Sequence, residues 1–273
     1  MPLAEPCMGS RTGCYATNLH DMKKFLLTII GLCALSPSAM AQDEAPKHLR
    51  FFPIGGLPIW KETLKKGVRE GDPHLPGSVP PKVSMVSGGK VVPLDLMLKV
   101  FTPLQTLAPS TKGLTLKDGL APESPNWLRQ AKPTAPLSLG VLLPNAADKL
   151  WFKPRMLMLD DDASSFPAGK IRFVNVSDKV VYIRIGGERG RAFGVAPGKA
   201  SKPRPVKIGS NSLKTIYRNG KGEDVTIWKN AIKVAANQRV QCFFCNTNAG
   251  KGKKSVEFHF LPEALPRLPK APK

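Results

Sequence analysis

Prolines and glycines divide the second half of this chain into short apolar runs, and this division limits the folds it can adopt. The 273 residues include 27 prolines and 24 glycines. From Lys170 onward, strand-like runs fall at 170–176, 179–185, 191–195, 204–208, 213–218, 224–233, 239–245 and 254–260. Turn-forming pairs such as Pro197-Gly198 and Asn219-Gly220 separate them. This spacing predicts a mainly β protein built on an antiparallel sandwich of the Ig-like or jelly-roll type.

The stretch from Lys170 to Gly187, KIRFVNVSDKVVYIRIGG, has the clearest strand pattern. β-Branched and aromatic residues fill both of its runs, and these residue types suit a pleated surface. Alternate residues of the second run are apolar, which is the period of a strand with one buried face. Ser177-Asp178 lies between the runs and is typical of a turn. We therefore predict that 170–176 and 179–185 form the first hairpin of the sandwich.

The first half of the chain has a less regular pattern. Strand-like runs occupy 48–54, 82–86, 90–101, 137–143 and 155–159. Gly88-Gly89 indicates a hairpin between the second and third of these. Trp60, Leu64 and Val68 are spaced as the apolar stripe of a short amphipathic helix, predicted over 59–69.

Residues 102–136 are rich in Pro, Ser, Thr and Gly, and only 126–130 has helical character. A loop this long is unusual inside a compact domain, so it is either a decorated loop or a boundary. We predict an N-terminal β-rich region over 42–165 and a C-terminal sandwich over 166–262. The N-terminal strands either extend the sandwich or form a smaller unit on it. The tail over 263–273 is rich in proline and lysine and is expected to be extended.

The N-terminus has the pattern of a targeting segment. Met22-Lys23-Lys24 precedes an apolar run over Phe25–Leu35, and Ala39-Met40-Ala41 supplies a small-residue cleavage site. These features predict a signal peptide over 22–41, cut after Ala41, and a periplasmic or secreted mature protein. Residues 1–21 precede a complete signal peptide, so we expect them to be a misassigned extension.

A short motif resembles a known group of proteins. Ala168-Gly169-Lys170-Ile171-Arg172-Phe173-Val174-Asn175-Val176-Ser177 is followed about twenty residues later by Val195-Ala196-Pro197-Gly198. This pattern resembles exported bacterial β-sandwich domains of unknown function, in which a V-R-F-V-N-x-S strand opens the sandwich and an A-P-G turn links two strands. The resemblance implies a sandwich and export, and it brings no catalytic residue.

The net charge of +21 is the largest deviation in composition. Removing residues 1–41 takes away three basic and two acidic residues and leaves a net charge of +20. A field of this size attracts polyanions and depends on salt. The basic clusters predict a binding patch made of Lys202, Arg204, Lys207, Lys214, Arg218, Lys251, Lys253 and Lys254.

The expected partners follow from the predicted export. Outside the cytoplasm the polyanions are anionic polysaccharides and lipid head groups, and an envelope protein is a further candidate partner. The sequence has no motif that reads nucleic acid, so sequence-specific recognition of nucleic acid is not expected. No second apolar stretch of 18 or more residues follows the predicted signal peptide, so no membrane span is expected in the mature chain.

Cys242-Phe243-Phe244-Cys245 contains the only cysteines of the predicted mature chain. In a regular strand, residues three apart lie about 10 Å apart and point to opposite faces, whereas a disulfide needs Cα atoms within about 7 Å. The sequence leaves three readings open: two packed thiols, a structural disulfide across a strand end, or a redox or metal site. No helix pattern follows the first cysteine, as a thioredoxin-type site requires.

The remaining ligand-type residues give weaker signals. Val256, Phe258 and Phe260 predict an inward face for the last strand, which places His259 outward and exposed beside Glu257. Asp160-Asp161-Asp162 carries carboxylates of the kind that bind calcium, but it lacks the spacing of a calcium loop and is typical of a solvated turn. We predict no metal site from either group.

No catalytic motif such as G-x-S-x-G or H-E-x-x-H occurs in the sequence. We therefore predict no catalytic residue and no cofactor. The leading hypothesis is an exported, non-catalytic protein that binds a partner or an anionic polymer at the cell envelope or outside the cell. The alternative is a periplasmic redox or metal-binding module that uses Cys242 and Cys245. A hydrolase built on the 102–136 region is the third class.

Overall fold

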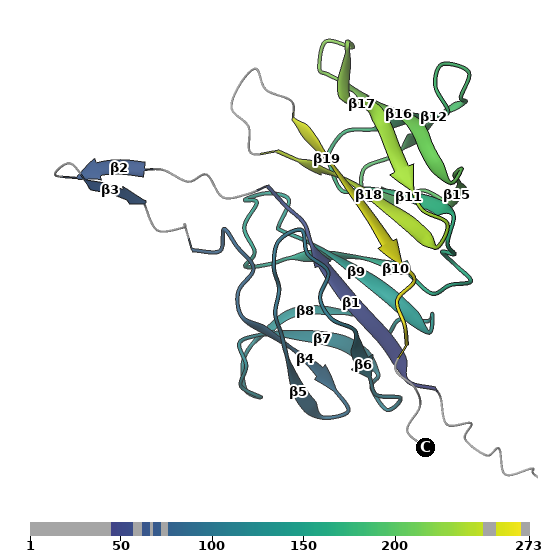
Figure 1. The fold of residues 1–273 in the computed structure, drawn as a ribbon. Coiled ribbons are helices and arrows are strands. Elements are labelled where there is room, and N and C mark those ends of the chain that lie inside the picture. Colours follow the sequence, from purple (N-terminus) through teal and green to yellow (C-terminus); the bar gives the residue numbers. More distant parts are fainter. Residues whose placement is uncertain (1–44, 57–61, 66–67, 72–75, 248–254, 269–273) are drawn as a thin grey trace, which may run out of the picture. The chain divides into compact units, whose positions relative to one another are not determined.

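The computed structural model describes residues 45–56, 62–65, 68–71, 76–247 and 255–268. Their regular structure consists of strands, with no helix among the described residues, so the chain is mainly β as predicted (Figure 1). Ala45–Lys273 forms one compact unit. The predicted signal peptide and the extension before it lie outside the described residues.

Two four-stranded sheets come from the first part of the chain. Sheet I has the order β5-β4-β7-β8, with β4 Val83–Ser87, β5 Lys90–Leu94, β7 Gly113–Asp118 and β8 Asn126–Ala131. Sheet II has the order β10-β9-β1-β6, with β1 Lys47–Pro53, β6 Gln105–Leu107, β9 Leu137–Leu143 and β10 Arg155–Asp160. A separate pair of strands is formed by β2 Glu62–Lys65 and β3 Val68–Gly71.

Two more sheets come from the second part. Sheet III has the order β14-β11-β18-β19, with β11 Lys170–Asn175, β14 Lys199–Ala200, β18 Gln238–Asn246 and β19 Val256–Ala264, and β15 Arg204–Pro205 also pairs with β11. Sheet IV has the order β13-β12-β16-β17, with β12 Val181–Ile185, β13 Ala192–Val195, β16 Gly209–Arg218 and β17 Asp224–Val234.

Three apolar clusters join these sheets in succession. The first joins sheets I and II and includes Phe51, Met85 and Trp127. The second joins sheets II and III through residues such as Phe52 and Phe243, whose ring centroids lie 4.4 Å apart. The third joins sheets III and IV, and its members are Ile171, Phe173, Val181, Ile183, Val195, Leu213, Tyr217, Ile227, Ile232, Val234, Val240, Cys242, Phe244 and Val256. Sheets II and III are therefore covered on both faces.

The central strands of sheets II and III explain this layering. β1 pairs with β9 and β11 pairs with β18, and both pairs run parallel. Nearly every residue of these four strands is buried. Strands buried on both faces are near-continuous apolar runs rather than alternating ones, and LSLGVLL of β9 is such a run. The expected antiparallel arrangement is therefore wrong for these two pairs.

The predicted hairpin over 170–185 is also wrong. β11 belongs to sheet III and β12 to sheet IV, and the two strands do not pair with each other. Asn175 stabilises the segment that leads from sheet III to sheet IV. Its Nδ2 donates hydrogen bonds to the carbonyls of Lys179 at 2.7 Å and Val195 at 2.8 Å. The apolar residues of β11 and β12 consequently face each other across one core instead of lying side by side in one sheet.

Further expectations for the first half of the chain need correction. The long irregular connection predicted over 102–136 instead contains β6, β7 and β8, because each of them pairs with a neighbouring strand. Residues 126–130, for which helical character was predicted, belong to β8, because pairing with β7 buries Trp127 and Leu128. The helix predicted over 59–69 is not confirmed. Its described residues are the strands β2 and β3, and residues 57–61 and 66–67 lie outside the described part. Gly67 weakens a helix there, since glycine costs about 0.5–1 kcal/mol relative to alanine in a helix interior.

Candidate functional site

The outer face of sheet IV carries a row of three basic side chains. Arg184 on β12 pairs in register with Lys214 on β16, and Lys214 pairs in register with Lys229 on β17. Neighbouring strands lie about 4.8 Å apart, so three positive charges share a line about 10 Å long. Like charges directly opposite each other destabilise a sheet. The fold itself therefore gains nothing from this row.

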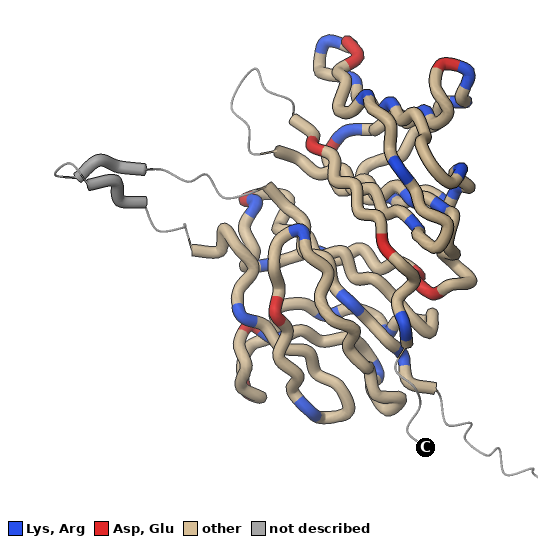
Figure 2. The backbone as a smooth tube through the Cα atoms, in the orientation of Figure 1, with Lys and Arg blue, Asp and Glu red and all other residues tan. Residues whose placement is uncertain are grey.

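Two more basic residues extend this surface along the strands. Lys233 follows Lys229 on β17, and Arg218 follows Lys214 on β16, each about 13 Å further along at the rise of an extended strand. We call Arg184, Lys214, Arg218, Lys229 and Lys233 the basic face. Lysine and arginine positions recur along the backbone of this part of the chain (Figure 2). Arg218 lies 3.3 Å from the exposed carboxylate of Asp224. Within the described residues, the other four members form no ion pair with a carboxylate.

The patch predicted from sequence is divided by the structure. Lys214 and Arg218 belong to the basic face. Three of the predicted residues lie in or next to β15 of sheet III, namely Lys202, Arg204 and Lys207. The guanidinium of Arg204 lies 3.7 Å from the ring centre of Phe193, so this residue is already engaged. The other three predicted residues, Lys251, Lys253 and Lys254, lie outside the described part of the chain.

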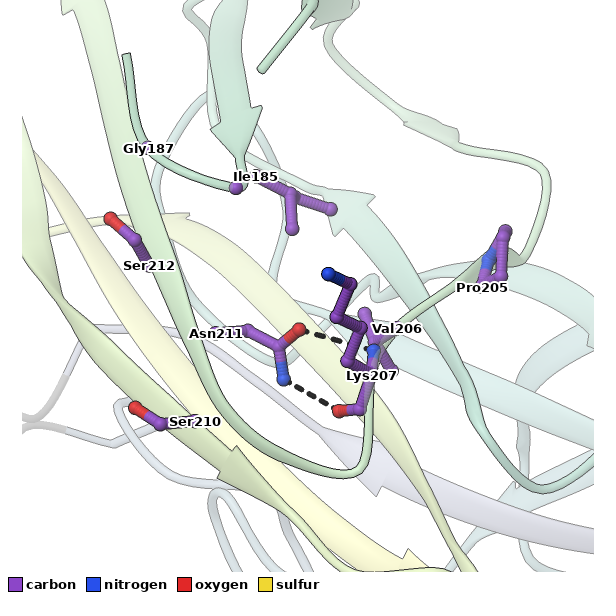
Figure 3. A pocket seen from close by; sticks show the side chains of 9 residues that line it. Ile185, Gly187, Pro205, Val206, Lys207, Ser210, Asn211 and Ser212 are labelled. Carbon is purple, nitrogen blue, oxygen red and sulfur yellow. Dashed lines mark hydrogen bonds between the residues drawn. The ribbon is translucent and has the colours of Figure 1, made fainter. Parts of the chain in front are cut away.

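A shallow cavity of about 360 Å³ adjoins one end of the basic face (Figure 3). Ser210 and Ser212 of β16 line it together with Lys207, whose side chain extends toward Ile185. Asn211 fixes the cavity wall, because its amide accepts from the Lys207 backbone N at 3.1 Å and donates to the Lys207 carbonyl at 2.7 Å. Hydroxyl groups and one ammonium group are therefore available beside the basic face.

The two cysteines of β18 lie on opposite faces of sheet III. Cys242 belongs to the core between sheets III and IV, and Cys245 belongs to the core between sheets II and III. Both are buried free thiols. Burial raises the pKa of the Cys242 thiol, and burial together with a hydrogen bond to Glu257 raises the pKa of the Cys245 thiol. Two thiols that face different layers cannot act together on one substrate.

We expect both thiols to be inert in the folded protein. Iodoacetamide should modify neither Cys242 nor Cys245 under native conditions, because thiolate is the reactive form and burial disfavours it. In urea without reductant, both should be modified completely. Mass spectrometry of the alkylated protein checks this. A pair that reacts only after reduction would show a disulfide and contradict the free-thiol arrangement.

His259 is not the exposed residue that the sequence predicted. It lies on the face of β19 that is turned away from Val256, as expected, but sheet II covers part of that face. Its side chain is only 21% exposed, and its Nε2 lies 3.1 Å from Oε1 of Glu257. Lys99 Nζ lies 2.9 Å from the same oxygen. The covering layer could not be inferred from the strand's own pattern.

A group of buried charges lies between sheets II and III. Asp161, which is fully buried, contacts three arginines: Arg50 at 2.6 Å, Arg172 at 2.8 Å and Arg239 at 2.9 Å. Glu263 accepts two hydrogen bonds from Arg50, at 2.6 and 2.7 Å. We call these five residues the buried ion cluster. Three positive and two negative charges leave it with a net charge of +1.

The surroundings of the cluster fix its geometry. Phe166 stacks against the guanidinium groups of Arg172, at 4.3 Å, and Arg239, at 4.7 Å. Burial and the neighbouring charge of Arg239 lower the pKa of Arg172 to about 10 despite its contact with Asp161. Burial acts to raise the pKa of Glu263, but hydrogen bonding and the charge of Arg50 outweigh it and lower that pKa. Because these groups are already paired, we assign the cluster to fold stability.

The three consecutive aspartates do not converge on one point. Asp161 points into the buried ion cluster, whereas the side chain of Asp160 is exposed. Asp162 accepts hydrogen bonds from Ser164 and Ser165 of the following turn. Burial acts to raise the pKa of Asp162, but these hydrogen bonds lower it to about 2. The arrangement is that of a turn and a buried ion pair.

A scan of protein-family models finds no match to this chain, and a search of curated proteins finds none either. The resemblance to exported sandwich domains therefore stays a prediction. Among the described residues, no helix has the length and apolar character needed to cross a membrane.

Proposed function

We propose that the chain is an exported, non-catalytic protein that binds an anionic polymer through the basic face. The row of Arg184, Lys214 and Lys229 carries this proposal, because the paired like charges oppose folding and an anionic ligand relieves that repulsion. Export rests on the signal peptide predicted over 22–41. The shared core of sheets III and IV supports the finer proposal of an Ig-like or jelly-roll sandwich.

An anionic polysaccharide fits this face better than a lipid surface does. Membrane-binding surfaces combine basic residues with exposed Trp, Phe or Leu that enter the acyl region. On the basic face, the apolar neighbours Tyr182 and Ile216 are half-buried in the sheet. Ser210, Ser212 and Thr226 instead add hydroxyl groups between the charges. Charges on a polar surface with hydroxyl neighbours suit a chain of acidic sugars.

The redox alternative built on Cys242 and Cys245 is not favoured by the geometry. A dithiol site needs both sulfur atoms at one accessible place, and these two belong to different cores. Burial also raises the pKa of both thiols, which opposes thiolate chemistry. We therefore base the proposed function on the basic face.

Replacing Lys214 with glutamate tests this proposal through two readouts that move in opposite directions. The new carboxylate lies between Arg184 and Lys229, so cross-strand attraction should stabilise the fold by up to about 1 kcal/mol. Binding of heparin, used as the anionic polysaccharide, should weaken by at least about tenfold at 0.15 M salt, since one attractive charge becomes repulsive. Fluorescence anisotropy with labelled heparin oligosaccharide and urea unfolding measure the two effects.

A matched control distinguishes binding at the basic face from a general effect of the protein's net charge. The test variant combines Lys214→Glu with Lys229→Glu. The control variant combines Lys82→Glu with Lys90→Glu and changes the net charge by the same amount. Lys82 and Lys90 have exposed side chains on and beside sheet I. Only the first pair should weaken heparin binding strongly. Equal losses from both pairs would overturn the assignment of binding to this face. Binding to phosphatidylglycerol vesicles but not to heparin would overturn the polysaccharide class.

A further inference from the structure

Three metal-ligand side chains of different chemistry meet where β18 pairs with β19. Cys245 on β18 is in register with Glu257 on β19, and His259 follows two residues later on the same face. A thiol sulfur, a carboxylate oxygen and an imidazole nitrogen lie within 4.8 Å of one another. The sequence alone did not reveal this group, because it depends on the register in which β18 and β19 pair.

We infer that Cys245, Glu257 and His259 bind a divalent metal ion of the zinc class. Thiolate, imidazole and carboxylate are the three ligand types that zinc takes from proteins. Zinc bonds of about 2.0–2.3 Å place tetrahedral ligand atoms about 3.3–3.7 Å apart, so the present group needs to close by only about 1 Å. Calcium and magnesium prefer oxygen ligands and do not suit this set.

The hydrogen bonds of the group leave one nitrogen unsatisfied. Oε1 of Glu257 accepts from the Cys245 thiol at 3.0 Å and from Lys99 Nζ at 2.9 Å. Nε2 of His259 lies close to the same oxygen but is a buried atom that makes no regular hydrogen bond. A metal ion bound by this nitrogen and by the sulfur would supply the partner that the nitrogen lacks. The thiol proton is then released to solvent.

Two of the three ligand side chains are partly exposed at the edge of the protein interior. Side chains of Glu257 and His259 are 30% and 21% exposed. Cys245 also lines a cavity of about 580 Å³ at the end of the interface between sheets II and III. Three protein ligands leave a fourth position for water or a ligand, which is the arrangement of an open zinc site.

The same residues are poorly arranged for nucleophilic catalysis. A cysteine nucleophile requires a base beside the thiol, and a third group usually orients that base. Here the carboxylate of Glu257 lies between the thiol and the imidazole, so His259 contacts Glu257 rather than Cys245. Metal binding is therefore the chemistry that this geometry favours.

Titration of the purified full chain with Zn²⁺ by isothermal calorimetry tests the inference. We expect one ion per chain, with a binding enthalpy that depends on the buffer because the thiol proton is released. Cys245→Ser and His259→Ala should each weaken binding by more than about a hundredfold, since even loss of an outer contact costs 10–100-fold. Co²⁺ should give a thiolate charge-transfer band that is absent from Cys245→Ser.

Two further variants make the outcome specific. Cys242→Ser is the matched control, because this thiol lies three residues away on the other face, and it should leave metal affinity unchanged. Lys99→Met removes a cation 2.9 Å from Glu257 and should strengthen binding by about three- to tenfold. Zinc binding that survives Cys245→Ser and His259→Ala together, or no stoichiometric binding by the unmodified chain, would overturn the inference. Neither outcome bears on heparin binding, because the basic face belongs to a different sheet.

Discussion

Replacing Asp161 with alanine is expected to lower the free energy of unfolding by about 3–5 kcal/mol. The change leaves three buried guanidinium groups with one carboxylate, so the net charge of the buried ion cluster rises from +1 to +2. Arginine cannot escape this by losing its proton near neutral pH. Arg239 has no exposed side-chain surface, so solvent does not reach it without a local opening. Urea unfolding of the variant measures the loss.

Two further variants distinguish the effect of an unpaired buried charge from a non-specific effect of a substitution in this segment. Asp160→Ala is the matched control, because this neighbouring side chain is exposed, and its carbonyl, which accepts from Arg172, is retained. It should change stability by less than about 0.5 kcal/mol. Adding Arg172→Met to Asp161→Ala restores a net charge of +1 and should recover part of the stability. Equal effects of Asp160→Ala and Asp161→Ala would show that the cluster is hydrated.

Local sequence patterns were sufficient to locate most strands but not their pairing. The apolar runs over 170–176 and 179–185 became strands β11 and β12, because β-branched residues suit an extended chain in either sheet. The polar turn between them supports a hairpin and a crossing between layers equally well. Only the shared core of sheets III and IV decides between the two arrangements, and it involves residues distant in sequence.

The functional groups were harder to predict than the strands, because their positions depend on the register in which distant strands pair. Arg184, Lys214 and Lys229 are 30 and 15 residues apart in sequence, so no local cluster of basic residues contained all three. The predicted patch included Lys214 and Arg218 because both belong to one local cluster of basic residues, which forms part of β16. Members of the buried ion cluster extend from Arg50 to Glu263, and their charges resembled ordinary surface residues in the sequence.

Phe243 and Phe244 lie between the two cysteines of β18. Variants of these two residues test whether the sheets unfold together. Phe243 stacks on Phe52 in the core between sheets II and III, whereas Phe244 packs in the core between sheets III and IV. Both rings are fully buried. Truncating a buried phenylalanine to alanine costs about 3–5 kcal/mol, so either variant should lose stability by a similar amount.

Phe243→Ala and Phe244→Ala are expected to expose different thiols. Loss of Phe243 weakens the contact between sheets II and III, so Cys245 should become reactive at a lower urea concentration than Cys242. Loss of Phe244 weakens the core between sheets III and IV, so Cys242 should react first. Pulsed iodoacetamide labelling at increasing urea, followed by peptide mass spectrometry, gives the order. Simultaneous labelling of both thiols in both variants would mean that the four sheets unfold as one cooperative unit, and that the interface between sheets II and III is as strong as the core between sheets III and IV.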